Sequence, residues 1–287
     1  MSENPDSAIE ETAVRDELLS LEALLISRCY LFALFHKAFG GEPNSLFLES
    51  MASTITVDVV NEYAHADETM GKLEVFISGL SDKARDASFL DEAITEYALF
   101  FEGPADLPAY PWEAPYISHD ATVFQKSTLT IREAYRSYGL QVKLFQHVPD
   151  DHVSTMCAFM GHLADRSLTA FRDRRFGDLG VLLGDQYRFV RDHLNNWIPE
   201  YAKLARNAKT ACLYPQLIHG MQAFARLDEV FLAETLVWLG GSSAEAAVAC
   251  NMSYEAPSAF AAVENILARL NEIRLVGIEE NELVEVA

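Results

Sequence analysis

Apolar residues recur at three- and four-residue spacing through most of this chain, which is the pattern of amphipathic helices. The longest such stretch spans residues 13–39, and its apolar positions are Leu18, Leu21, Leu25, Cys29, Phe32 and Phe39. Gly40, Gly41 and Pro43 follow directly, and glycine and proline end helices. We therefore predict a long core helix over residues 13–39.

The same spacing predicts further helices along the rest of the chain. We expect them at about residues 45–51, 56–64, 67–80, 89–101, 120–138, 150–172, 178–195, 199–207, 213–239 and 257–270. Residues 55–60 are rich in β-branched side chains, but no partner strand is evident, so we assign them to a helix. Ser88 and Ser118 are expected N-caps, and Gly139 is expected to close a helix.

These elements predict an all-α fold with roughly ten or more helices in one globular domain. We expect an acidic flexible tail at residues 1–12 and the helical domain at residues 13–240. Gly240, Gly241, Ser242 and Ser243 mark a boundary. Residues 241–287 are then a helical extension that ends in a mobile acidic tail.

The net charge of -21, from 43 acidic and 22 basic residues, decides which partners the surface favours. A polyanion would be repelled over most of the surface, so we expect no nucleic-acid binding through phosphates. A cationic partner would be attracted, although acidity that serves solubility alone is the simpler alternative.

Other features of the composition point to a reducing compartment. The four cysteines, Cys29, Cys157, Cys212 and Cys250, form no Cys-x-x-Cys pair, so they are expected to be buried thiols. The N-terminus lacks the basic start and apolar run of a secretory signal, and the most apolar segment, residues 18–39, contains several charges. We expect a cytoplasmic protein without stable membrane insertion.

Two proline-containing loops carry the most informative side chains. Residues 105–117 contain three prolines and include Trp112, Glu113 and Tyr116, and residues 149–152 read Pro149-Asp150-Asp151-His152. Aromatic rings in a loop cost free energy in water unless something covers them. The two loops are therefore expected to bind a ligand.

The same loops allow alternative interpretations. His119 with Asp120, and His147 with Asp150, Asp151 and His152, offer metal ligands for a hydrolase, although an Asp at a helix start is ordinarily an N-cap. In the cap interpretation Asp150 or Asp151 begins the helix, and His152 is neutral or held by an acid such as Glu113. The common enzyme signatures are absent from the sequence.

Several ordered motifs resemble the TorD/DmsD family of redox-enzyme maturation chaperones. They are Glu96-Tyr97, Phe100-Phe101-x-Gly103-Pro104, Pro111-Trp112-Glu113-x-x-Tyr116, Tyr135-x-x-x-Gly139-Leu140, Pro149-x-Asp151-His152 and Phe159-Met160. The resemblance covers about residues 18–239. This chain departs from it at Met156, where the family often has Glu, and in the segment from Gly241 onward, which has no counterpart.

The resemblance implies a cytoplasmic, all-helical protein that binds the twin-arginine signal peptide of a molybdopterin oxidoreductase catalytic subunit until its cofactor is inserted. It implies no cofactor and no catalytic activity for the chain itself, which would work as a monomer or a domain-exchanged dimer. The expected peptide-binding residues are Phe101, Trp112, Glu113, Tyr116, Pro149, Asp151 and His152.

A receptor for such a leader needs an acidic rim beside an aromatic groove. We assign the rim to Glu113 and Asp151, and the groove to Trp112, Tyr116, Phe100 and Phe101. Phe100 is better explained by core packing. A metal-dependent hydrolase and a helical scaffold or regulatory subunit remain the alternatives.

Overall fold

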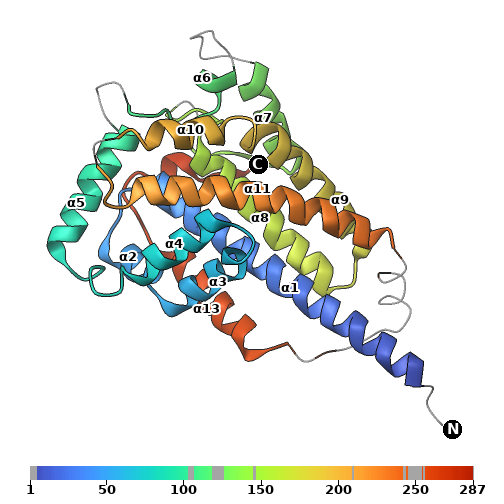
Figure 1. Ribbon diagram of the computed structural model, residues 1–287. Helices are drawn as coiled ribbons and strands as arrows, with labels where there is room; N and C mark the ends of the chain where they lie inside the picture. The colour runs from blue at the N-terminus through green and yellow to red at the C-terminus, as the bar shows by residue number, and fades with distance from the viewer. Residues whose placement is uncertain are drawn as a thin grey trace.

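The computed structural model describes residues 5–102, 107–117, 126–144, 147–208, 210–241, 244, 254 and 256–286. Within these ranges the fold is all-α with twelve α-helices, as the apolar spacing predicts (Figure 1). The elements are α1 (Pro5–Gly40), α2 (Ser45–Met51), α3 (Thr54–Ala64), α4 (Glu68–Ser78), α5 (Ala87–Tyr97), η1 (Ala98–Glu102), α6 (Ala114–Ile117), α7 (Lys126–Ser137), β1 (Leu140–Val142), α8 (Val153–Arg172), α9 (Phe176–Phe189), η2 (Val190–Leu194), α10 (Ile198–Ala205), α11 (Tyr214–Leu239), α13 (Ser258–Glu272), η3 (Ile278–Asn281) and β2 (Leu283–Glu285).

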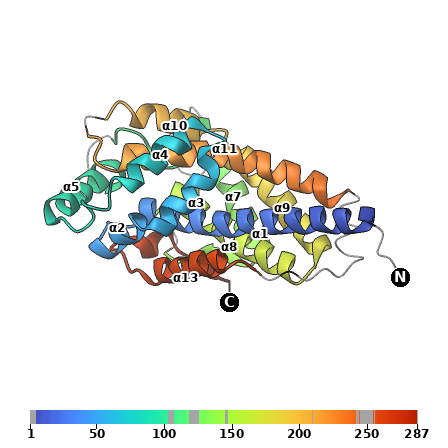
Figure 2. The same ribbon diagram turned by 60° about the horizontal axis from the view of Figure 1, so that its bottom comes forward.

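Helix α1 is the central element of the fold. It packs most extensively against α8 and also contacts α13, α11 and α3, so that it lies between α11 on one side and α13 on the other (Figure 2). Its residues Leu25, Phe32 and Phe39 are fully buried, as predicted. By length and composition α1 could cross a membrane, but 72% of its apolar window is buried inside the protein, which is typical of a core helix.

The charged residues of α1 are tolerated in the core because each has a partner. Glu22 accepts a hydrogen bond from Arg172 at 2.7 Å, and Arg28 forms a fully buried ion pair with Asp228. Lys37 donates to the backbone oxygen of Ile273 at 2.9 Å. Burial of an unpaired charge would cost several kcal/mol, so these contacts position α8, α11 and the C-terminal segment against α1.

The structure corrects several expected helix boundaries. Helix α1 already begins at Pro5 and therefore includes most of the segment that we expected to be a flexible tail. Residues 54–64 are helical as predicted, because buried Val59, Val60 and Tyr63 pack at helical spacing. The N-cap of α5 is Asp86 instead of Ser88, whose own backbone amide donates to it. The proposed cap Ser118 lies outside the described residues.

The C-terminal segment is the largest departure from the predicted fold. We expected a mobile acidic tail, but residues 278–281 form the 3-10 turn η3 and residues 283–285 form strand β2. Strand β2 pairs antiparallel with β1, and Val142 lies opposite Leu283. Gly139 precedes β1 with φ of +69°, which confirms the predicted left-handed helix end. Backbone pairing and the buried side chain of Ile278 hold this segment on the domain.

Candidate functional site

The two loops singled out from the sequence lie side by side and pair through their backbones. The amide of Glu113 donates to the oxygen of Asp151 at 3.2 Å, and the amide of Val153 donates to the oxygen of Pro111 at 2.8 Å. Trp112 and His152 face each other in this antiparallel bridge. Residues about forty positions apart in the sequence therefore form one local structure.

Asp151 connects the second loop to the first. Its Oδ2 accepts a hydrogen bond from the amide of Ala114 at 2.8 Å, at the start of α6, while its Oδ1 is buried without a hydrogen-bond partner. Burial raises the pKa of the carboxyl group to about 6, and nearby Glu113 and Asp150 add to the rise. The hydrogen bonds from backbone amides oppose it. Asp151 thus stabilises α6 and does not cap α8, contrary to our prediction.

Asp150 connects the same loop to α7. Its Oδ2 accepts from Nη2 of Arg132 at 2.5 Å, and its backbone oxygen accepts from the hydroxyl of buried Tyr135 at 2.9 Å. Asp150 is therefore not the α8 cap either. Pro149 is half-buried, and its oxygen accepts from the amide of His152 at 3.0 Å.

His152 itself is the N-cap of α8. Its Nδ1 accepts a hydrogen bond from the amide of Ser154 at 3.2 Å, which requires an unprotonated nitrogen. Burial and the neighbouring His36 lower the pKa of His152 to about 3, so the ring is neutral at physiological pH. A neutral ring resolves the conflict between a cation and the positive end of a helix.

The predicted contact between His152 and Glu113 is wrong. The carboxylate of Glu113 points to η2 and the turn after it, where it accepts from Nδ2 of Asn196 at 2.8 Å and lies 3.3 Å from Nδ1 of His193. Tertiary packing brings both partners of Glu113 from a segment about eighty residues away in the sequence. The sequence offered no local signal for them.

Aromatic side chains cover the outer side of the paired loops. Trp112 is half-buried and its ring packs on exposed Tyr110 with ring centroids 5.2 Å apart. The hydroxyl of Tyr116 donates to the oxygen of Tyr110 at 2.8 Å, and the Tyr116 ring packs on Trp197 at 5.3 Å. Ile117 is also exposed. We call Tyr110, Trp112, Tyr116 and Ile117 the aromatic surface.

The expected acidic rim is not formed by the residues we assigned to it. Glu113 and Asp151 are both only 1% exposed, and their carboxylates are turned toward the interior. Their role in this structure is to hold the two loops and the aromatic surface in place.

Phe100 and Phe101, of the motif Phe100-Phe101-x-Gly103-Pro104, differ in burial as expected. Phe100 is fully buried core, whereas Phe101 is half-buried and lies among the rings of Tyr97, Tyr214 and His152. The contact between Phe101 and His152, with ring centroids 6.3 Å apart, connects η1 to the paired loops. Gly103 and Pro104 of the same motif lie outside the described residues.

Glu96 has a structural role that sequence reasoning did not assign. Its buried carboxylate accepts from the amides of Cys212, Leu213 and Tyr214 at 2.9, 2.6 and 2.8 Å, and from the hydroxyl of Thr210. These amides belong to the start of α11, which lacks a side-chain cap of its own. Glu96 therefore caps α11 from α5.

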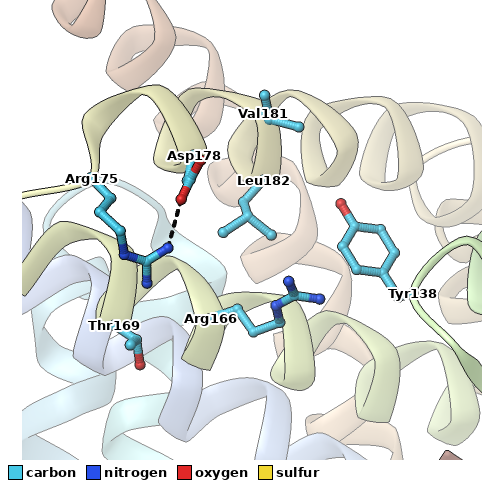
Figure 3. A pocket seen from close by; sticks show the side chains of 7 residues that line it. All are labelled: Tyr138, Arg166, Thr169, Arg175, Asp178, Val181 and Leu182. Atoms are coloured by element: carbon cyan, nitrogen blue, oxygen red, sulfur yellow. Dashed lines mark hydrogen bonds and ion pairs between the residues drawn. The ribbon is translucent and has the colours of Figure 1, made fainter. Parts of the chain in front are cut away.

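Two hollows elsewhere in the fold show no relation to the paired loops. One of about 320 Å³ lies between α8 and α9, where Arg166 stacks on Tyr138 and Arg175 pairs with Asp178 (Figure 3). A second, of about 390 Å³, lies between α1, α8 and the C-terminal segment.

The metal interpretation gains no support from the part of the chain that the structure describes. No group of three potential metal ligands occurs within it. The side chain of His147 is largely exposed, and its Nδ1 lies 3.9 Å from Oε1 of Glu280. His119 and Asp120 lie outside the described residues.

The chain is similar to one protein family and to several chaperones. The nitrate reductase delta subunit family matches residues 62–203, which include both loops. The chain is 25% identical over 200 residues to the chaperone protein TorD of Photobacterium profundum, a match that covers 63% of this chain and 88% of that protein.

Two further relatives match over shorter stretches. The chaperone protein TorD of Vibrio vulnificus is 24% identical over 141 residues, or 49% of this chain and 64% of that protein. The probable Tat proofreading chaperone DmsD of Haemophilus influenzae is 31% identical over 91 residues, or 30% of this chain and 45% of that protein. No solved structure matches the chain significantly.

Proposed function

Because this chain belongs to the TorD/DmsD family of redox-enzyme maturation chaperones, we propose that it binds a twin-arginine signal peptide in the cytoplasm. The peptide belongs to the catalytic subunit of a molybdopterin oxidoreductase. Binding holds the precursor until its cofactor has been inserted, and release then allows export. The protein acts as a binding module and not as an enzyme.

The observation that carries this proposal is the pairing of the two loops beneath an aromatic surface. Backbone hydrogen bonds between Pro111 and Val153 and between Glu113 and Asp151 fix the loops, so that the surface is preorganised. A preorganised surface loses little conformational freedom on binding. Trp112 and Tyr116 are only half-buried, and rings of this kind are common anchors for apolar partners.

The chemistry of a leader peptide matches this surface and the charge of the chain. The apolar run of the leader covers the rings, and the net charge of -21 attracts its basic head. Of the expected site residues, Phe101, Trp112 and Tyr116 contact the leader. Glu113, Pro149, Asp151 and His152 hold the loops that present it.

The two alternatives fit the same observations less well. A hydrolase needs ligands that converge on a metal, and the described residues bring no such group together. A helical scaffold would use an exposed apolar face of α11 and tolerate changes in the paired loops. The large apolar side chains of α11 that are exposed are Val230 and Val237, and they offer a partner less apolar area than the rings of the aromatic surface.

The test compares two tryptophan substitutions. Trp112→Ala is expected to weaken binding of a synthetic twin-arginine leader peptide by about 2 kcal/mol, or roughly thirty-fold, in titration calorimetry. The control is Trp238→Ala, since Trp238 is also half-buried but lies on α11, where it donates to Glu17. Equal affinities of the two variants for the peptide would contradict the proposed site.

A further inference from the structure

The C-terminal segment, residues 273–286, is docked along the end of α1. Near its start, Nζ of Lys37 donates to the oxygen of Ile273 at 2.9 Å, and the amide of Glu42 donates to the oxygen of Val276 at 2.8 Å. Near its end, β2 pairs with β1. These contacts fix both ends of the segment, and η3 lies between them.

Two glycines at the end of α1 leave no room for a side chain. A Cβ on Gly40 would lie 2.7 Å from Cδ1 of Ile278 in η3, and it would also overlap Oγ of Ser154 in the first turn of α8. A Cβ on Gly41 would lie 2.6 Å from Cβ of Leu275. The end of α1, the first turn of α8 and η3 therefore meet at one place, which we call the junction.

Asn281, the last residue of η3, links the two helices at the junction. Its Nδ2 donates to the oxygen of Gly40 at 3.1 Å, and its Oδ1 accepts from the hydroxyl of Thr155 at 3.3 Å. Asn281 is only 5% exposed and Thr155 is fully buried. Buried polar groups that lose their partners destabilise a fold, so these two bonds hold η3 in one position against α8.

The same turn of α8 connects the junction to the paired loops. The Oγ of Ser154 donates to the oxygen of His36 at 2.9 Å, and Nδ1 of His36 lies 3.1 Å from the oxygen of Ser154. The amide of Ser154 donates to Nδ1 of His152 at 3.2 Å. His152 in turn is the bridge partner of Trp112 and contacts the ring of Phe101. A shift of this turn would therefore reach both rings.

We propose that Asn281 is a positioning residue for leader binding: it fixes the first turn of α8 against the end of α1, and thereby fixes His152 and the paired loops. This inference rests on the proposed function. It gives the C-terminal extension a part in binding without any contact with the leader. A surface that is held in place before binding loses less conformational freedom when the leader binds, so a loosened junction should weaken binding.

The first test measures affinity for the synthetic twin-arginine leader peptide by titration calorimetry. Asn281→Ala removes both bonds of the junction, and we expect it to bind the leader about five-fold more weakly than the unmodified protein does. Thr155→Val keeps the shape of its side chain but removes the hydroxyl, and it should also weaken binding. The double variant should bind about as weakly as Asn281→Ala, because both residues act through one contact.

Asn44→Ala is the matched control. Asn44 also donates through its Nδ2 to the C-terminal segment, but it does so at the oxygen of Arg274, at 3.0 Å, and its Oδ1 caps α2. The control thus loses the same side-chain amide and one anchor of the same segment, while the bonds of Asn281 remain. It should leave the affinity for the leader nearly unchanged.

A second measurement follows His152 in the absence of the leader. Since Nδ1 of His152 accepts a hydrogen bond, the neutral ring carries its proton on Nε2. NMR spectra of protein with ¹⁵N-labelled histidine distinguish this tautomer from the other, and the signal of His152 is identified by its loss in His152→Gln. We expect Asn281→Ala to move the signal toward the average of the two tautomers, and Asn44→Ala to leave it in place.

The outcomes separate the positioning role from the proposed function. Equal affinities of Asn281→Ala and Asn44→Ala for the leader, or a His152 signal that Asn281→Ala leaves in place, would overturn the positioning role and leave the function standing. Thr155→Val provides the same two comparisons if Asn281→Ala does not fold. If the unmodified protein bound no leader peptide, the proposed function itself would fail, and the NMR comparison would still decide whether Asn281 positions His152.

Discussion

Asp151 provides the sharpest test of how the two loops are held together. Its carboxylate has one oxygen bonded to the amide of Ala114 and one buried oxygen without a partner. Asp151→Asn keeps the shape of the side chain and an oxygen for Ala114, but removes the buried charge. We expect the variant to stay folded and to change how stability depends on pH.

The direction in which stability changes with pH follows from the raised pKa of Asp151. The group titrates near its ordinary value of 3.8 in the unfolded chain and at about 6 in the folded protein, so the folded state binds the proton more tightly. Its contribution to stability is therefore greatest at low pH and is lost as pH rises through about 6. The whole rise corresponds to about 3 kcal/mol, of which about 1 kcal/mol is lost between pH 5 and pH 7.

Urea unfolding of both proteins at pH 5 and pH 7 measures this loss. Other titrating groups act alike in the two proteins, so their effects largely cancel in the difference. The free energy of unfolding of the unmodified protein should fall by about 1 kcal/mol more than that of the variant. If the difference between the two proteins were the same at both pH values, the assigned burial of this charge would be refuted.

Three other predictions concern the contact of Asp151 with α6, the capping of α11 and the electrostatic attraction of the leader. Asp151→Ala leaves the amide of Ala114 without its acceptor, so it should loosen α6 and weaken leader binding in calorimetry more than Asp151→Asn does. Glu96→Gln should lower the free energy of unfolding in urea by about 2 to 4 kcal/mol, because backbone donors of α11 lose a carboxylate oxygen. The exposed Glu92→Gln on the same helix should change stability by less than about 0.5 kcal/mol, and similar values for both would contradict the capping role. Raising the salt concentration should slow association of the leader more than it speeds release in stopped-flow measurements, and salt-independent association would exclude steering by the acidic surface.

Much of the helical framework could be predicted because local patterns specify it. Residues 45–51 are helical at the predicted bounds, and the central helix buries the apolar positions that its spacing marked. Gly139 ends its helix as expected, since a positive φ strongly favours glycine. The docked C-terminal strand was missed because β2 is three residues long and its partner is about 140 residues away.

The candidate site shows the same contrast between local patterns, which could be predicted, and contacts between distant segments, which could not. The paired loops could be recognised from their prolines, aromatic residues and acids, and the loops do lie together. The partners of their charged groups were wrong: Glu113 meets His193 and Asn196, and Asp151 meets Ala114. Sequence spacing carries no information about contacts between distant segments unless a local pattern accompanies them.

The sequence by itself determined the helical fold, the central helix and the two loops that matter, because helix periodicity, prolines and exposed aromatic residues act within a few positions. Only the tertiary structure decided which carboxylates are interior and which face outward. Glu113 and Asp151 are turned inward, while Glu92 and Glu279 are exposed. A carboxylate has the same formula in either place, and only the folded chain determines whether it is buried beside backbone amides or faces water.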